Sequence, residues 1–134
     1  MNADQKSVAQ RCLDSAYAGS RTFPEILNLL HGADIEGYTV DYRRGVTTYY
    51  APDGSSVELA NPGVAPGPVE AAFNADIIIS GIRDAQTNAA GYTYKGFCEK
   101  VVAGGCAGYH VSLPGRRAVY FGRTAETHVE HFPA

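Results

Sequence analysis

The sequence lacks the features that mark several common classes of protein. It has no tryptophan, and no apolar run approaches the roughly 18 residues of a membrane-spanning helix. The N-terminal stretch Met1-Asn2-Ala3-Asp4-Gln5-Lys6 is polar and has no apolar core of the kind found in signal peptides. These absences argue against a membrane protein and predict a cytoplasmic one.

Cysteine is scarce as well. Cys12, Cys98 and Cys106 are an odd number of thiols and include no CxxC pair, which argues against a disulfide framework and against a thiolate zinc site. We expect three reduced and mostly buried thiols.

The motifs of several enzyme classes are absent too. The sequence has no GxSxG and no phosphate-binding loop. Cys106 and His110 would lie about 13 Å apart on a strand, too far for a thiolate–imidazole pair. A net charge of −3 argues against nucleic-acid binding. The sequence therefore leans toward a non-enzymatic protein and requires no cofactor.

What the chain does contain is an internal repeat. Gly37-Tyr38-Thr39-Val40 matches Gly108-Tyr109-His110-Val111, and Tyr49-Tyr50 matches Tyr120-Phe121, at one constant offset in the numbering. An Arg43-Arg44 pair and an Arg116-Arg117 pair follow the first tyrosine of each copy. The repeat predicts a duplicated structural unit.

Hydrophobic periodicity and turn residues give each copy the same order of elements. Helices are expected at about 4–18, 22–31, 76–88 and 94–103, with a further short helix at 69–73. Strands are expected at about 38–42, 46–50, 56–59, 107–113, 117–122 and 127–132. The pattern predicts an α+β fold, an ααβββ unit duplicated into a mainly antiparallel sheet with helices packed on one face.

The 134 residues fit one domain. Residues 61–68 contain three of the seven prolines and read as a linker between two pseudo-symmetric halves, about 1–60 and 69–134. How the two three-stranded units join stays open at this stage.

Several motifs resemble the uncharacterised bacterial YbcV-like family. They are Cys106-Ala107-Gly108-Tyr109, Gly115-Arg116-Arg117, Tyr120-Phe121-Gly122-Arg123-Thr124 and Glu126-Thr127-His128-Val129-Glu130-His131-Phe132-Pro133, with Thr47-Thr48-Tyr49-Tyr50-Ala51-Pro52-Asp53-Gly54 upstream. The resemblance covers nearly the whole chain. It implies a small cytoplasmic protein of unknown function, sometimes labelled phage-related, and it supplies no catalytic residue.

The C-terminal strand carries the densest polar cluster. Glu126, His128 and Glu130 would share one face of a strand, and carboxylates with an imidazole are possible metal ligands. Ligands two residues apart on a strand rarely close on one ion. A metal-binding protein or metal-dependent enzyme therefore stands as an alternative beside a solvated strand face.

The paired hairpins supply the candidate ligand-binding residues. Guanidinium groups bind carboxylate or phosphate, so a small anionic ligand is one hypothesis, and arginines that serve solubility alone are the other. Tyrosines also line binding surfaces. The candidates are His110, Arg116, Arg117, Tyr120, Arg43, Arg44 and Tyr49.

The interpretation is a non-enzymatic module that binds a small ligand or a protein partner. The alternatives are the metal site and a homodimeric accessory protein that pairs through a free sheet edge. Because Thr39 and His110 differ between the copies, any site is expected in the second half.

Overall fold

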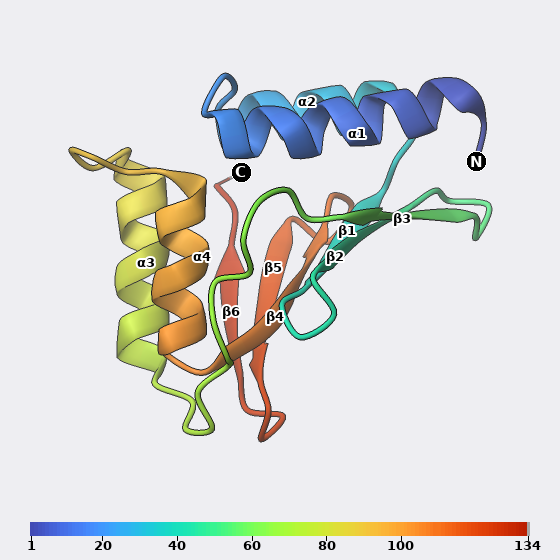
Figure 1. Ribbon diagram of the computed structural model, residues 1–134. Coiled ribbons are helices and arrows are strands. Elements are labelled where there is room, and N and C mark those ends of the chain that lie inside the picture. The colour runs from blue at the N-terminus through green and yellow to red at the C-terminus, as the bar shows by residue number, and fades with distance from the viewer. Residues whose placement is uncertain (134) are drawn as a thin grey trace.

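The computed structural model describes residues 1–133, which form an α+β fold of four helices and a six-stranded antiparallel sheet (Figure 1). The helices are α1 (Ala3–Ala18), α2 (Phe23–Gly32), α3 (Ala75–Thr87) and α4 (Tyr94–Ala103). The strands are β1 (Gly37–Asp41), β2 (Val46–Tyr50), β3 (Ser56–Ala60), β4 (Cys106–Ser112), β5 (Arg117–Gly122) and β6 (Thr127–His131). The expected α+β class and the order ααβββ in each half are confirmed.

Local sequence explains where the first two helices begin. The Asn2 side chain accepts a hydrogen bond from the Gln5 backbone amide, and the Gln5 side chain accepts one from the Asn2 amide. Thr22 and Glu25 form the same reciprocal pair at the start of α2. Such capping boxes satisfy amide groups that have no partner within the helix, and this fixes the first residue of each helix.

The two halves join at the centre of the sheet. The strand order is β3-β2-β1-β4-β5-β6, so β1 of the first half pairs with β4 of the second, antiparallel. In that ladder Thr39 lies opposite His110, its own counterpart in the repeat. The strand order and the register are symmetric about this pair of residues, and we call the line between them the pseudo-twofold axis of the sheet.

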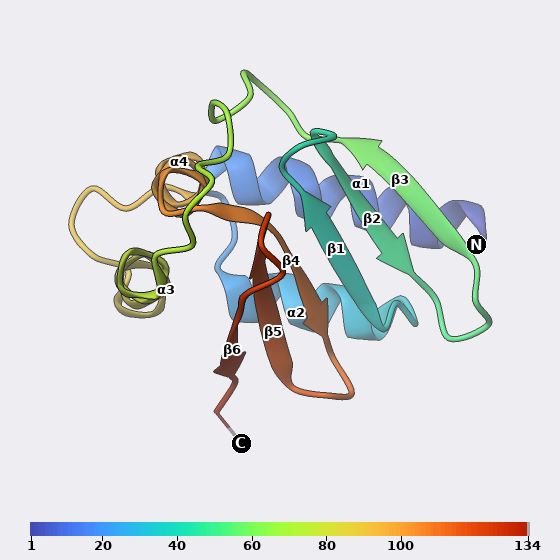
Figure 2. The same ribbon diagram turned by 90° about the horizontal axis from the view of Figure 1, so that it is seen from below.

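Both helix pairs cover the same face of the sheet. Seen from below, α1 and α2 lie behind the strands and α3 and α4 lie to one side (Figure 2), where Phe97 of α4 contacts the rings of Tyr109 and Tyr120. Alternation along the strands turns Tyr38, Val40 and Tyr109 toward the helices, where they are buried. One core cluster takes in residues from all four helices and from the sheet.

The second half of the core repeats the tyrosine pairing of the first. The rings of Tyr38 and Tyr49 lie 5.3 Å apart, and those of their counterparts Tyr109 and Tyr120 lie 5.0 Å apart. Such pairs add to the stability that burial of the rings provides. The repeated tyrosines are therefore core residues on the helix-covered face.

The segment 61–74, which includes the linker, has no helix, and the short helix expected at 69–73 is wrong. The backbone amides of Glu70 and Asn74 donate instead to the carbonyls of Val102 and Gly104. Phe73 lies so close to Gly122 that a Cβ there would be 2.6 Å from the ring. The segment is thus held by backbone hydrogen bonds and by packing of Phe73 against Gly122, without a helix.

No helix within residues 1–133 is long and apolar enough to cross a membrane.

Candidate functional site

The arginine pairs of the two hairpins lie at opposite ends of the sheet. Arg43 and Arg44 are in the β1–β2 turn, and Arg116 and Arg117 are in or beside the β4–β5 turn. Because β1 and β4 are antiparallel, their following turns point in opposite directions. The Arg44 guanidinium is paired with Glu58 at 2.9 Å, with both side chains exposed. The four arginines therefore cannot form one anion site.

Two of the candidate tyrosines lie on the helix-covered face. Tyr49 and Tyr120 are 3% and 4% exposed, within the core. The Tyr120 hydroxyl donates a hydrogen bond of 3.1 Å to Glu130 Oε1. Burial first, and then the Glu130 charge, raises the pKa of Tyr120 well above its ordinary value. Both rings are separated from His110 by the sheet.

The C-terminal acidic and histidine residues do not gather around one point. Glu126 precedes β6 and accepts a hydrogen bond of 2.7 Å from the Thr124 hydroxyl. Glu130 accepts hydrogen bonds from Tyr120 and from the Gln86 amide. Among residues 1–133, no three histidine, cysteine or acidic side chains are placed to hold a metal ion.

The three thiols are free and buried. Burial raises the pKa of Cys106 to about 12, against the lowering effect of hydrogen bonds with the backbone of Gly108 and Phe121. Burial likewise raises the pKa values of Cys12 and Cys98. Protonated, enclosed thiols are poor nucleophiles, so these cysteines serve the core.

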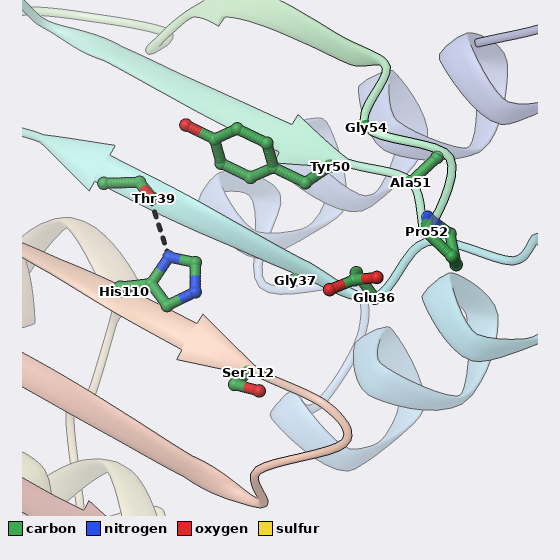
Figure 3. Close-up of a pocket in the computed structure, with 9 residues that line it drawn as sticks. All are labelled: Glu36, Gly37, Thr39, Tyr50, Ala51, Pro52, Gly54, His110 and Ser112. Carbon is green, nitrogen blue, oxygen red and sulfur yellow. Dashed lines mark hydrogen bonds between the residues drawn. The ribbon is translucent and has the colours of Figure 1, made fainter.

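His110 is the candidate that lines a cavity. The cavity has a volume of ≈ 330 Å³ and opens on the sheet face turned away from the helices, at the end where β1 begins (Figure 3). Its lining residues are Glu36, Gly37, Thr39, Tyr50, Ala51, Pro52, Gly54, His110 and Ser112. Seven of these nine come from the first half, and His110 and Ser112 come from the second.

A hydrogen bond across the pseudo-twofold axis holds the imidazole in place. Thr39 Oγ1 lies 2.7 Å from His110 Nδ1, and which of the two donates depends on the tautomer. In either tautomer Nε2 is the ring nitrogen left for another partner. Figure 3 shows Nε2 turned into the cavity, toward Glu36.

The environment of His110 favours the neutral imidazole. Burial lowers its pKa from the ordinary value of 6.5, and the nearby Glu36 carboxylate opposes part of that change. At neutral pH the ring therefore presents one uncharged hydrogen-bonding atom to the cavity. The Glu36 side chain, which is exposed, supplies the negative charge at the rim.

Tyr50 forms the aromatic wall of the cavity. Its ring centroid is 6.2 Å from that of His110, at an angle of 60°. The side chain is 37% exposed, in contrast to the buried Tyr49 beside it. Gly37, opposite Tyr50 in the β1–β2 ladder, forms the floor because it has no side chain.

Sequence reasoning found His110 and missed Glu36, Tyr50 and Ser112. The period-2 alternation did separate Tyr50 from Tyr49, which was a usable signal. The missing information was the pairing of β1 with β4, since that contact alone brings Ser112 and His110 beside the first hairpin.

Comparisons with models of known protein families and with curated proteins give no match. The assignment of function therefore depends on the geometry of this cavity.

Proposed function

We propose that the protein is a non-enzymatic module that binds a small molecule in the His110 cavity. The observation that carries the proposal is the cavity itself, with an imidazole fixed by Thr39 and aimed into it. Its volume of ≈ 330 Å³ is at the lower end of the range of small-ligand sites, about 300–1,000 Å³. An apolar wall with a few fixed polar groups is typical of such sites.

The charges favour a neutral or cationic ligand. Glu36 is the charged residue among those that line the cavity, and neutral His110 adds no positive charge. A carboxylate at the rim attracts an ammonium or N–H group and repels an anion. A small anionic ligand would depend instead on Arg117, which pairs with Ser112 in the β4–β5 ladder.

Binding is favoured over catalysis because the hydroxyl beside the imidazole is only partly accessible and the thiols lie outside the cavity. The hydroxyl bonded to His110 belongs to Thr39, a half-buried residue in the middle of β1. The thiols lie in the core with raised pKa values. An imidazole that is held through Nδ1 and leaves Nε2 available suits recognition by hydrogen bonding.

A fragment screen by nuclear magnetic resonance tests the proposal. Neutral and cationic fragments should shift the His110 ring signals, and His110→Ala should remove these interactions. His131→Ala is the matched control, since His131 is an exposed histidine on the edge strand β6. Fragments that bind the wild type and His110→Ala equally well would disprove the assignment of the site.

A second proposal is that the sheet edges take a protein partner or a second copy of the chain. β3 and β6 end the strand order, so each leaves one side unpaired within residues 1–133. Free edges accept a further strand. If β6 makes a dimer, Val129→Lys should lower the mass measured by light scattering, whereas Val64→Lys in the linker should not. A mass equal to one chain at all concentrations would exclude the homodimer.

We also propose membership of the YbcV-like family and a cytoplasmic location. The shared C-terminal motif supports the first. Three free, buried cysteines fit a reducing compartment and support the second. A structure of a family member with the same β1–β4 pairing would test the family assignment, and localisation of a tagged chain would test the compartment.

A further inference from the structure

The repeat contains two versions of the arrangement that makes the cavity floor. Gly37 lies opposite Tyr50 in the β1–β2 ladder, and Gly108 lies opposite Phe121 in the β4–β5 ladder. Each version sets one glycine beside one aromatic ring on the sheet face turned away from the helices. Comparison of the two versions indicates what kind of group fits against the glycine on this face of the sheet.

The two aromatic rings take different positions. A Cβ placed on Gly108 would be 2.8 Å from the Phe121 ring, so this ring covers the glycine. A Cβ placed on Gly37 would have His110 Cε1, at 3.7 Å, as its nearest side-chain atom. Tyr50 is turned outward and is 37% exposed. Both glycines are buried, but the nearest side chain to Gly108 is its ladder partner Phe121, whereas the nearest side chain to Gly37 is His110 and not its ladder partner Tyr50.

The residue on the pseudo-twofold axis accounts for this difference. The imidazole of His110 lies beside Gly37, with Cε1 3.7 Å from the position a Cβ would take there. Its counterpart Thr39 is shorter and leaves the corresponding space to Phe121. The larger side chain at one of two equivalent positions therefore keeps Tyr50 out and the cavity open.

We propose that the cavity binds a flat aromatic ring that carries an amine or another N–H donor; this inference rests on the proposed function. The ring lies over Gly37, in the place that Phe121 takes over Gly108, between the faces of His110 and Tyr50. The donor group is directed to the Glu36 carboxylate. The protein's own Phe121 side chain shows that a six-membered ring fits against such a glycine.

The spacing of the two rings sets the side-chain movement that this ligand shape requires. A flat ring in contact on both faces needs roughly 7 Å between its neighbours, since carbon atoms in contact are about 3.5–4 Å apart. The centroids of Tyr50 and His110 are 6.2 Å apart in an open V of 60°. Because Tyr50 is exposed, a rotation of its side chain away from His110 widens the gap to the roughly 7 Å that an inserted ring needs.

A matched pair of probes tests the proposal. Benzylamine and cyclohexylmethylamine have the same charge and nearly the same size, but only the first has a flat aromatic ring. In titrations followed by the ring signals of His110 and Tyr50, benzylamine should bind between about twofold and tenfold more tightly, the gain expected from ring–ring contacts. Tyr50→Leu should reduce this preference, and His131→Ala should not.

Each result separates the inference from the proposed function. If both amines bind equally well at His110, the inference about the ring is wrong and the small-molecule site stands. If neither amine perturbs His110 at millimolar concentration, both are overturned. If benzylamine retains its advantage in Tyr50→Leu, Tyr50 is not the wall that selects the ring.

Discussion

Thr39 and His110 occupy equivalent positions 71 residues apart, and their side chains are hydrogen-bonded to each other at 2.7 Å. They also face each other in the β1–β4 ladder, so the pseudo-twofold axis of the sheet passes between them. In a strictly symmetric protein both positions would carry the same residue. Their difference leaves a cavity on one side of the axis and a covered glycine on the other.

Restoring the symmetry should close the cavity. His110→Thr places threonine at both positions beside the axis, 39 and 110. Gly37 would then have the same kind of neighbour that Gly108 already has in Thr39. We expect the Tyr50 ring to move over Gly37, as Phe121 lies over Gly108. The free energy of unfolding should change by less than about 1.5 kcal/mol, since burial of Tyr50 offsets the loss of the imidazole contacts.

The ring signals of Tyr50 and the binding of benzylamine check this result. A folded His110→Thr variant that still binds benzylamine as tightly as the wild type would contradict it. Thr39→Gly gives the comparison in which the hydrogen bond is lost while the imidazole remains.

The lowered pKa of His110 makes stability depend on pH in a defined direction. Below pH 6.5, the ordinary pKa of histidine, the imidazole is protonated in the unfolded chain. In the folded protein its pKa is lower because the ring is partly buried, so the ring takes up its proton only at a lower pH. The free energy of unfolding should therefore fall as the pH drops from 6.5 through the lower pKa of the folded state. This loss is absent above 6.5.

Denaturant unfolding of the wild type and His110→Thr, at about pH 7.5 and about pH 5, isolates this contribution from the other histidines. The wild type should lose more stability between the two conditions than the variant does. Equal losses, or an NMR titration midpoint of His110 above 6.5, would show that the imidazole is not held neutral.

Two core tyrosines should respond oppositely to loss of their hydroxyl groups. The Tyr109 hydroxyl is hydrogen-bonded to that of Tyr94, whereas the buried Tyr42 hydroxyl has no nitrogen or oxygen partner among residues 1–133 and has only the weakly bonding Cys98 thiol beside it. Tyr109→Phe should lower the free energy of unfolding by about 1 kcal/mol, and Tyr42→Phe should leave it unchanged or raise it by up to about 1 kcal/mol.

Chemical denaturation of the two variants side by side measures this difference. Both substitutions remove one oxygen from a buried ring, so each serves as the control for the other. A larger destabilisation in Tyr42→Phe would mean that its hydroxyl has a bonding partner.

The contact that Ala72, in the segment before α3, makes with the start of the second hairpin depends on Gly105. Its φ is +91°, and a Cβ would come within 2.1 Å of the Ala72 carbonyl oxygen. Gly54 has nearly the same φ, +89°, with open space around it. Gly54→Ala should cost about 1–2 kcal/mol from the backbone alone. Gly105→Ala should cost about 1–3 kcal/mol more because Ala72 must move.

Thermal unfolding of both variants gives the comparison. Equal losses of stability in the two variants would mean that the segment around Ala72 is loosely packed and can move away from the new methyl group with little loss of free energy.

Much of the fold follows from local pattern. The 71-residue repeat predicted two ααβββ units, and the Thr22 and Glu25 cap predicted the start of α2. The short helix at 69–73 was wrong because Phe73 packs against Gly122, a contact between distant parts of the chain that periodicity cannot show.

The site was harder to predict for the same reason. His110 was a candidate, but the cavity forms where β1 of one half pairs with β4 of the other. Sequence alone left that pairing open. Tyr49 and Tyr120 share the motif with the site residues and belong to the core, because alternation turns them to the helices.

A crystal structure of the protein soaked with benzylamine tests the central claim most directly. The account predicts the ring over Gly37, between His110 and Tyr50, with its ammonium group toward Glu36. A ring bound elsewhere, such as beside Lys100 in the smaller cavity of ≈ 230 Å³ between α3 and α4, with the His110 cavity empty, would contradict it.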